Sequence, residues 1–314
     1  MTTLSPTHPV RRRPPRRAYS AIPGETPGTP PWRALKSLIL LICVVLVLLP
    51  FLAIISTSLA GTAQVTKAGG YVLWPDNPGF SAYSALLSGG LVSKAMLVSV
   101  GITVVGTALS LLGSISLAYG LSRPGSFGHK PILMLLLMSL LFVPGVIPSY
   151  LMVKQLGLIN SYWSLILPTM INAFNVIVLR SFFMGIPKEL IDSARIDGAS
   201  ELSILTRIVL PLSKASVAVI GLFYAVTYWN AFFNALLYIN DAAKWPMQMV
   251  LRTYVVNNAA LSGGQVDVAA GAPLPPAQSL QAAILVLSIV PIVIVYPFLQ
   301  RHMNKGVMVG AVKG

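Results

Sequence analysis

The run "LILLICVVLVLLPFLAII", residues 38–55, decides the fold class, because its 18 consecutive residues carry no charge. An α-helix rises 1.5 Å per residue, so this run is about 27 Å long, close to the hydrocarbon thickness of a bilayer. The whole chain is 55% hydrophobic and only 10% charged, with a mean hydropathy of +0.77. Charged residues make up about a quarter of a soluble domain. We therefore expect an all-α integral membrane protein.

Further apolar runs follow at residues 95–121, 132–153, 162–179, 215–238 and 277–299, which predicts six transmembrane helices. The first run has an alternative interpretation as a cleaved signal peptide, since "RRRPPRR" precedes it and "SLA" at 58–60 has the small residues of a cleavage site. It is longer than a typical signal h-region and five more runs follow, which favours a first span.

The net charge of +14 raises the possibility of nucleic-acid binding, but the cations are distributed as in a membrane protein. Seven Lys and Arg lie in the N-terminal arm, two at 122–131, five at 180–214 and three after residue 300, which is 17 of the 22. This is the positive-inside bias of a six-span protein with both termini in the cytoplasm. We therefore expect a multi-pass protein of a bacterial cell membrane without nucleic-acid partners. We expect residues 1–33 to be a disordered basic cytoplasmic tail, 34–314 to be a transmembrane domain, and 301–314 to be its cytoplasmic C-terminal tail.

The residue types needed for catalysis are missing from the predicted spans. All eight acids and all three histidines lie in loops or tails, and Cys43 is the only cysteine. The spans therefore offer no nucleophile with a base, no metal site and no buried ionisable residue for a coupling ion. The chain also lacks the G-x-x-x-x-G-K-[ST] phosphate loop. We expect no enzyme, no metal and no cofactor in this chain; if it moves solute against a gradient, a partner subunit must use the ATP.

The stretch "ELIDSARIDGASELSILTRIVLPLS", residues 189–213, holds four of the eight acids and lies between predicted spans four and five. Pro187 and then Glu189 suit the first turn of a helix. Apolar and charged residues then separate onto two faces at helical spacing. The apolar face is Leu190, Ile191 and Ala194, and the charged face is Lys188, Asp192 and Arg195.

This short helix is predicted to end at Gly198 in a left-handed turn, and Ser200 to cap the next helix. Large side chains at Gly198 are expected to fail both by steric clash and by backbone strain. An amphipathic helix fixed to two spans can act as a lever for another subunit. The alternative is a solvated loop whose charges only keep it out of the membrane.

"DSARIDGASELSILTRIVLP" resembles the EAA loop of importer permeases of the ATP-binding-cassette superfamily, which share the MetI-like fold. That pattern is E-A-A, three residues, Gly, nine residues and Ile-x-Leu-Pro. Here Asp192-Ser193-Ala194 stand for E-A-A, with Asp in place of Glu and Ser in place of the first Ala, while Gly198, Ile208, Leu210 and Pro211 fit the spacing. "IDGA" at 196–199 and the ending "KGVMVGAVKG" further resemble the carbohydrate-uptake branch, particularly permeases for oligo- and polysaccharide fragments.

The resemblance implies that the transmembrane domain, 34–314, is a permease domain, part of a transport subunit whose loop at about 187–211 is a coupling helix for a separate ATPase. The implied partners are a second homologous permease, two cytoplasmic ATPase subunits that bind the ATP, an extracytoplasmic sugar-binding protein and the lipid bilayer. Lys313 and Gly314 are weaker candidates for ATPase contact. The implied coupling residues are Glu189, Asp192, Ser193, Ala194, Asp197, Gly198, Ala199, Leu210 and Pro211. The rival classes are a stand-alone facilitator or channel, and a membrane-embedded enzyme or assembly factor.

Polar residues inside the predicted spans are candidates for a sugar pathway. At 100° per residue, span five places its polar and tyrosine side chains within one arc of roughly 160°. They either line a water-filled cavity or hydrogen-bond neighbouring helices. The candidates are Asn172, Asn175, Tyr224, Thr227, Tyr228, Asn230 and Asn234.

Two further features concern packing and the outer face. Gly106, Gly113 and Gly120 are seven residues apart in span two, with Ser99, Ser110 and Ser114 nearby, which predicts a stripe for close helix approach. Residues 239–276 form a long outer loop that begins with "NDAAKWPMQMVLR", a possible short interfacial helix.

Overall fold

The computed structural model describes residues 30–88, 90–123, 125–257 and 275–311, with side chains up to residue 297. Within these ranges the regular structure is entirely helical. The chain divides into two compact units, residues 1–51 and 52–314. In the first unit the described residues belong to helix α1 (Pro30–Leu59), whose side chains are exposed from residue 31 to 51. The predicted basic tail lies almost wholly outside the described residues.

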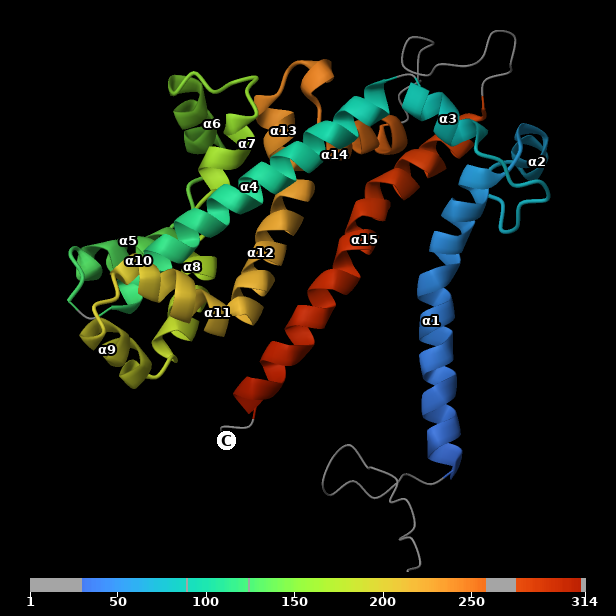
Figure 1. Cartoon of the computed structure of the whole chain (residues 1–314). Helices are drawn as coiled ribbons and strands as arrows, with labels where there is room; N and C mark the ends of the chain where they lie inside the picture. The colour runs from blue at the N-terminus through green and yellow to red at the C-terminus, as the bar shows by residue number, and fades with distance from the viewer. Residues whose placement is uncertain (1–29, 89, 124, 258–274, 312–314) are drawn as a thin grey trace, which may run out of the picture. The chain divides into compact units, whose positions relative to one another are not determined.

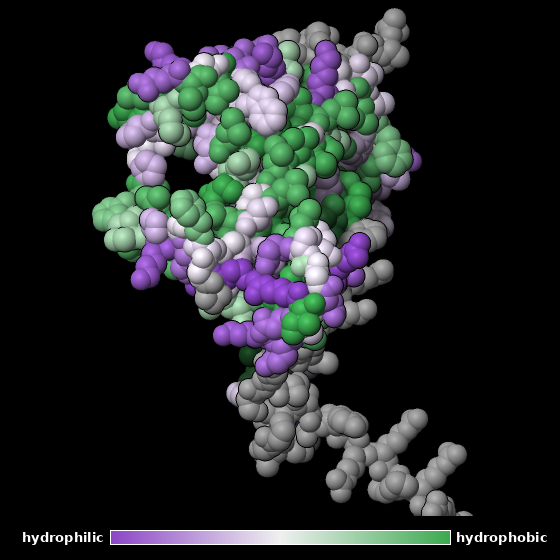
Figure 2. All heavy atoms as spheres, turned by 60° about the vertical axis from the view of Figure 1, so that its left-hand side comes forward, coloured by the Kyte–Doolittle hydropathy of each residue, from purple (hydrophilic) through white to green (hydrophobic). Residues whose placement is uncertain are grey.

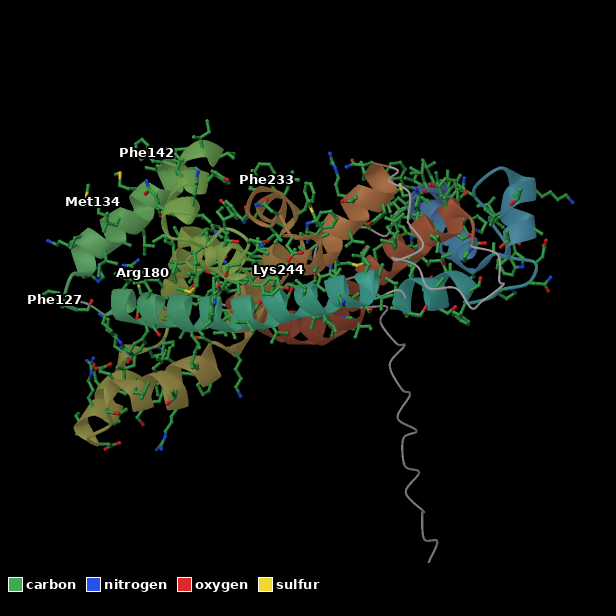
Figure 3. All side chains as sticks on the ribbon, turned by 90° about the horizontal axis from the view of Figure 1, so that it is seen from above. Phe127, Met134, Phe142, Arg180, Phe233 and Lys244 are labelled. Atoms are coloured by element: carbon green, nitrogen blue, oxygen red, sulfur yellow. The ribbon has the colours of Figure 1, made fainter. Side chains whose placement is uncertain are left out.

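The second unit is organised around α4 (Leu91–Ser122), an unbroken helix of 32 residues. Helices α8 (Ala173–Met184) and α12 (Lys214–Trp229) pack against α4, and α15 (Ala277–Ala311) packs against α12 (Figure 1). Arg180 of α8, labelled in Figure 3, donates from Nε to the carbonyl of Leu121 at 2.8 Å. This bond satisfies one of the carbonyls that the C-terminus of a helix leaves free.

The predicted small-residue stripe on α4 is confirmed over most of its length. A Cβ built on Gly106 would lie 2.8 Å from the ring of Tyr228, and one on Gly113 would lie 2.8 Å from Ile171. Gly120 has no such neighbour within 4 Å, so the prediction is wrong at that end. The glycines therefore serve close approach only where α12 and the segment before α8 cross α4.

The structure has three described helices that are long and apolar enough to cross a membrane, residues 31–59, 91–122 and 277–297. Two further pairs qualify if each bent pair is one span: Trp163–Thr169 with Ala173–Met184, bent by 51°, and Glu201–Leu212 with Lys214–Trp229, bent by 86°. The count among the described residues is therefore three to five, and the prediction of six spans is not confirmed.

The difference from six arises at predicted span 132–153, which consists of two separate helices, α5 (His129–Leu141) and α6 (Val146–Gln155). The chain between them contains Pro144, which has no N–H to continue a helix. Apolar side chains here point outward, including Phe127, Met134 and Phe142 (Figure 3). Figure 2 shows apolar residues over the middle of this face and hydrophilic residues gathered above and below them.

Predicted span four is also interrupted. It contains α7 (Trp163–Ile166), the short 3-10 helix η1 (Leu167–Thr169) and α8. The break between η1 and α8 falls at residues 170–172, within the apolar run. Backbone groups freed in a membrane-spanning segment must bond elsewhere in the protein or face a water-filled cavity.

Predicted span five, 215–238, is not one helix, which corrects the single polar arc expected on it. Helix α12 ends at Trp229 and α13 (Phe232–Tyr238) begins after a turn. The Asn230 side chain donates to the carbonyl of Val226 at 2.9 Å. Such side chain-to-backbone bonds compete with continued helix formation. Asn234 therefore lies on a different helix from Tyr224, Thr227 and Tyr228.

Short helices lie in two of the connecting segments. Between α1 and α4 the chain forms α2 (Thr62–Ala68) and α3 (Ser81–Ser88). The start of segment 239–276 forms η3 (Ala242–Lys244), α14 (Met247–Leu251) and the π-helical turn η4 (Arg252–Val256). The predicted short helix is thus present, but Met247 and Val250 are buried and the Met247 N–H donates to Ser99 Oγ at 2.7 Å. It is part of a protein core and does not lie free at an interface. Residues 258–274 of the predicted loop lie outside the described residues.

Candidate functional site

The short amphipathic helix that the sequence predicts after Pro187 forms as α9 (Lys188–Ile196). Its apolar face holds it to the protein: Ile191 is buried in the core, and Ala194 packs partly buried against the same core. Leu190, predicted on that face, is only half-covered. In Figure 3 the segment that contains α9 lies on the side of α4 away from α5. The helix is therefore fixed along one edge and open to solvent on the other.

The turn after α9 has the geometry that the sequence predicts. Gly198 adopts φ +80°, and the Ala199 N–H reaches back to the Ala194 carbonyl at 2.9 Å. Ser200 then caps the next helix by accepting from the Ser203 N–H at 3.3 Å. A Cβ on Gly198 would meet nothing within 4 Å, so the predicted clash does not occur within this chain. Backbone strain alone penalises a larger residue there, because side chains disfavour the left-handed region.

After the turn the chain continues as α10 (Glu201–Ile204), the π-helical turn η2 (Leu205–Val209) and α11 (Leu210–Leu212). Of the coupling residues expected here, Pro211 is exposed and Leu210 is partly buried. The chain then bends by 86° at Ser213 into α12. Because of this bend, the axis of the α10–α11 segment is nearly perpendicular to the axis of α12.

The open surface of α9 and its turn is both acidic and apolar. Glu189, Asp192, Ser193 and Asp197 are exposed there. Ile196, at the end of α9, is 87% exposed, and Leu202 of α10 is 70% exposed. The sequence analysis did not select these two residues. They could have been found from the sequence, because each is an apolar residue next to the charged residues of the turn. This part of the loop therefore presents exposed apolar side chains beside charged ones.

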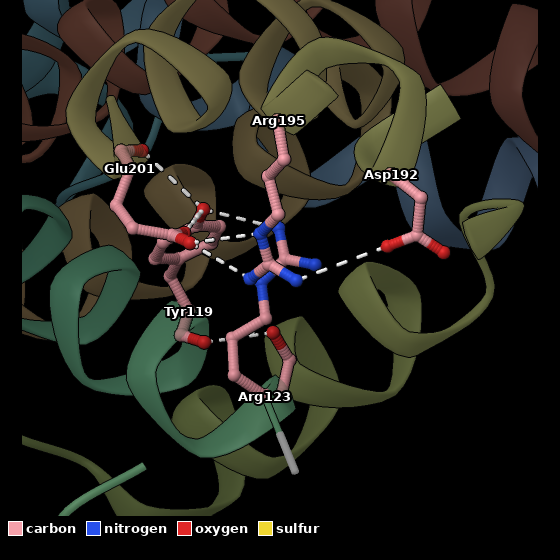
Figure 4. Close-up of polar contacts among 6 residues, drawn as sticks. Tyr119, Arg123, Asp192, Arg195 and Glu201 are labelled. Carbon is pink, nitrogen blue, oxygen red and sulfur yellow. Dashed lines mark hydrogen bonds and ion pairs between the residues drawn. The ribbon is translucent and has the colours of Figure 1, made fainter. Parts of the chain in front are cut away.

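Arg195 and Glu201 form an ion pair within this loop (Figure 4). Arg195 donates to Glu201 Oε1 from Nη2 at 2.7 Å and from Nε at 3.1 Å. Asp192, one turn earlier on α9, lies 3.8 Å from the Arg195 guanidinium. The ion pair therefore crosses the Gly198 turn and joins α9 to the start of α10.

Glu201 also contacts the end of α4 (Figure 4). Tyr119 Oη donates to Glu201 Oε2 at 2.5 Å, and Arg123 Nη2 donates to Tyr119 Oη at 3.0 Å while the guanidinium stacks 4.6 Å from the ring. The hydrogen bonds from Tyr119 and Arg195 hold the pKa of Glu201 below its usual range. One carboxylate thus binds α9 through one oxygen and α4 through the other. Sequence reasoning missed Tyr119 because it is 82 residues away from Glu201.

Tyr224 and Tyr228, predicted to line a pathway, face α4 in this structure. Both are 2% exposed. Tyr228 Oη hydrogen-bonds Ser110 Oγ at 2.7 Å, and Tyr224 Oη hydrogen-bonds Ser114 Oγ at 2.6 Å. The alternative interpretation, hydrogen bonding between neighbouring helices, describes these two residues.

The other predicted pathway residues differ in burial. Asn172 is exposed at the break before α8, where its side chain accepts from the Asn175 N–H at 3.2 Å and its own N–H donates to Tyr224 Oη at 3.1 Å. Asn175 itself is buried. Thr227 and Asn230 are exposed and bond carbonyls of α12, and Asn234 is partly buried on α13.

Within the described ranges, no three His, Cys, Asp or Glu side chains gather where they could hold a metal ion. The loop around α9 is a charged and partly apolar surface that is held to the core by Ile191.

Comparison with known proteins gives close relatives but no matching family model. The chain is 46% identical over 274 residues to the polygalacturonan/rhamnogalacturonan transport system permease protein YtcP of Bacillus subtilis, which covers 87% of this chain and 94% of that protein. It is 33% identical to the arabinooligosaccharides transport system permease protein AraQ of Halalkalibacterium halodurans, over 69% of this chain and 72% of that protein.

A solved structure also resembles the fold. It is a chain of a bacterial ABC transporter involved in the import of the acidic polysaccharide alginate, with a TM-score of 0.79 and 29% sequence identity. The match covers 88% of this chain and 99% of that chain. The likeness therefore extends over nearly the whole of the described structure.

Proposed function

This chain belongs to the sugar permeases of ATP-binding-cassette importers, and we propose that it forms half of the route by which an oligosaccharide or polysaccharide fragment is imported. The observation that carries this conclusion is the 46% identity to the polygalacturonan/rhamnogalacturonan permease over 94% of its length. The protein is accordingly a multi-pass protein of the inner membrane and a transport subunit.

The energy for transport enters, in this proposal, through α9 and the turn that follows it. Two features support this assignment: Ile191 fixes the helix to the core, and the opposite side presents Asp192, Asp197 and Ile196 to solvent. An ATPase subunit binds this surface in a cleft. Closure of two such ATPases on ATP moves the helices of two permeases together and changes the cavity from inward- to outward-facing.

The complete transporter then contains a second homologous permease, two cytoplasmic ATPase subunits and an extracytoplasmic sugar-binding protein. The chain crosses the membrane six times with both termini in the cytoplasm, so that α5 with α6 makes one span and the 187–211 loop faces the ATPases. Lys313 and Gly314 at the end of the tail add a weaker contact to them. The exposed Asn172, Thr227 and Asn230, with the partly buried Asn234, line the sugar route, while the buried Asn175, Tyr224 and Tyr228 lie within its wall.

The second candidate function is a stand-alone facilitator or channel for a polar solute. A facilitator needs no ATPase partner and no coupling helix. It therefore gives no reason for Ile196 and Leu202 to be exposed on the loop. ATP dependence of uptake separates the two functions.

The testing experiment is affinity purification from detergent-solubilised membranes with the native chain, Gly198→Val and Gly198→Asn. We expect the native chain to co-purify with an ATPase and a second permease. Because valine is strained at φ +80° whereas asparagine tolerates the left-handed region, Gly198→Val loses the ATPase but keeps the permease, and Gly198→Asn keeps both. A native chain that purifies alone and intact, with ATP-independent uptake, would favour the facilitator.

A further inference from the structure

We propose that Glu201 and Tyr119 form the joint that transmits movement of α9 to α4, so that they are positioning residues for coupling and not part of the ATPase-binding surface. This inference rests on the proposed function, because it concerns how a pushed α9 moves the spans. Neither residue belongs to the EAA pattern, and the structure alone brings them together.

The joint connects two helices because each oxygen of the Glu201 carboxylate receives a donor from a different helix. Glu201 Oε1 receives Arg195 of α9, and Oε2 receives Tyr119 of α4. The Tyr119 side chain is only 8% exposed and Arg123 covers its ring, so the phenol cannot move independently of α4. A displacement of α9 therefore reaches α4 through hydrogen bonds at both oxygens.

The Arg195–Glu201 ion pair is a poor candidate for a purely stabilising contact. Both side chains are about half exposed, and exposed ion pairs contribute only about 0–1 kcal/mol to folding. Its geometry, with two donors on one oxygen, instead fixes the position of α9 against α10. We therefore expect its loss to change coupling more than stability.

From Tyr119 the contacts continue to the predicted sugar route. Ser114 lies five residues before Tyr119 on the same unbroken helix, and it hydrogen-bonds Tyr224 of α12 at 2.6 Å. Tyr224 Oη in turn accepts the N–H of Asn172 at 3.1 Å, at the break between η1 and α8. A shift of α4 is therefore transmitted through Tyr224 to residues 170–172, where the helix of predicted span four is interrupted.

The experiment uses the complete transporter, with its partner permease, ATPases and binding protein, reconstituted in liposomes. The native complex is first assayed with labelled oligogalacturonide, arabino-oligosaccharide and alginate-oligosaccharide probes, and the transported probe is then used throughout. The variants are Tyr119→Phe, which removes only the donor hydroxyl, Glu201→Gln, which removes the charge, and the double variant. Thr206→Ala is the matched control, because the Thr206 hydroxyl is on the same loop and bonds carbonyls of the preceding turn, those of Leu202 and Ser203.

We expect all variants to retain the ATPase subunits and to hydrolyse ATP, because α9 keeps its exposed surface. The number of sugars transported per ATP falls at least about fivefold in Tyr119→Phe, the lower end of the usual coupling between distant sites. The double variant is no worse than the more affected single variant, since both changes break the same joint. Thr206→Ala transports as the native complex does.

A second readout requires no sugar. In a Cys43→Ser background, a cysteine at the exposed Ser116 of α4 reports movement of that helix by its labelling rate. ATP changes this rate in the native complex, and Tyr119→Phe abolishes the change. Unchanged sugar per ATP together with a normal ATP response in both single variants would overturn the joint and leave the function intact.

Loss of the ATPase subunits from both variants would also overturn the joint, because Glu201 would then belong to the docking surface. A native complex with neither ATP-driven uptake of any probe nor an ATP response at position 116 would instead count against the proposed function itself.

Discussion

The loop around α9 and the interface between α4 and α12 both depend on polar residues and glycine, but they use them in opposite ways. In the interface, Ser110 and Tyr228 bond each other in a buried contact, and Gly106 lets the Tyr228 ring touch α4. In the loop, Arg195 and Glu201 pair in solvent, and Gly198 has open space around it. The first region uses these residue types to bring helices together, and the second uses them to orient an exposed helix.

The difference predicts where a substitution will cost stability and where it will cost function. A buried polar atom that loses its partner carries a desolvation penalty, whereas an exposed one binds water instead. A glycine is required for steric reasons only where a neighbouring atom occupies the position that a Cβ would take. Changes in the interface should therefore lower the stability of the protein, and changes in the loop should leave a stable protein that binds or moves less well.

The largest effect is expected at Gly106. Gly106→Ala places a methyl group 2.8 Å from ring atoms of the buried Tyr228, and overpacking of this kind costs about 1–3 kcal/mol. Gly120→Ala meets nothing within 4 Å, so it should gain up to about 1 kcal/mol from helix propensity. Thermal unfolding in detergent measures both variants. Equal unfolding temperatures for the two would contradict the close approach of α4 and α12.

A smaller loss of stability is expected at the Ser110–Tyr228 pair. Tyr228→Phe leaves the Ser110 hydroxyl without this partner, and interhelical hydrogen bonds in membrane proteins contribute about 0.6–1.7 kcal/mol. The double variant with Ser110→Ala should cost less than the sum of the single variants, as a thermal double-mutant cycle would show. Tyr296→Phe is the control, because that side chain is exposed on α15. Strict additivity would mean that the hydrogen bond contributes nothing.

The smallest effect on stability, with a clear effect on binding, is expected at Ile196. Ile196→Ser changes a side chain that is 87% exposed, so the free energy of unfolding should change by less than about 0.5 kcal/mol. Retention of the ATPase on a column that holds this permease should nevertheless fall. Trp74→Ser, an equally exposed change in the segment between α1 and α4, should retain the ATPase fully. If both variants retain it equally, Ile196 is not part of the docking surface.

Local features of the loop were predictable from sequence because neighbours along the chain determine them. The amphipathic α9, the left-handed Gly198, the cap at Ser200 and the Asp192–Arg195 pair all depend on residues within one or two turns. The predicted clash at Gly198 is different in kind, because a Cβ there meets nothing within 4 Å in this chain and a clash would need a partner's surface.

The helical wheel of predicted span five failed because it assumed an unbroken helix. Asn230 bonds its own chain and the helix ends at Trp229. Residues 224 and 228 were assigned with 227 to one arc, yet the tyrosines are buried against α4 whereas Thr227 is exposed. Periodicity gives the angle between two side chains, but it does not say which neighbour covers them.

The sequence by itself determined that this is an apolar helical membrane protein with an EAA-like loop, because composition, helical periodicity and spacing act over short distances along the chain. Only the tertiary structure decided that Tyr119 meets Glu201 across 82 residues and that Tyr224 and Tyr228 bond serines of α4. These contacts depend on how helices cross. Crossing is set by the combined packing of many side chains, and no short segment carries that information.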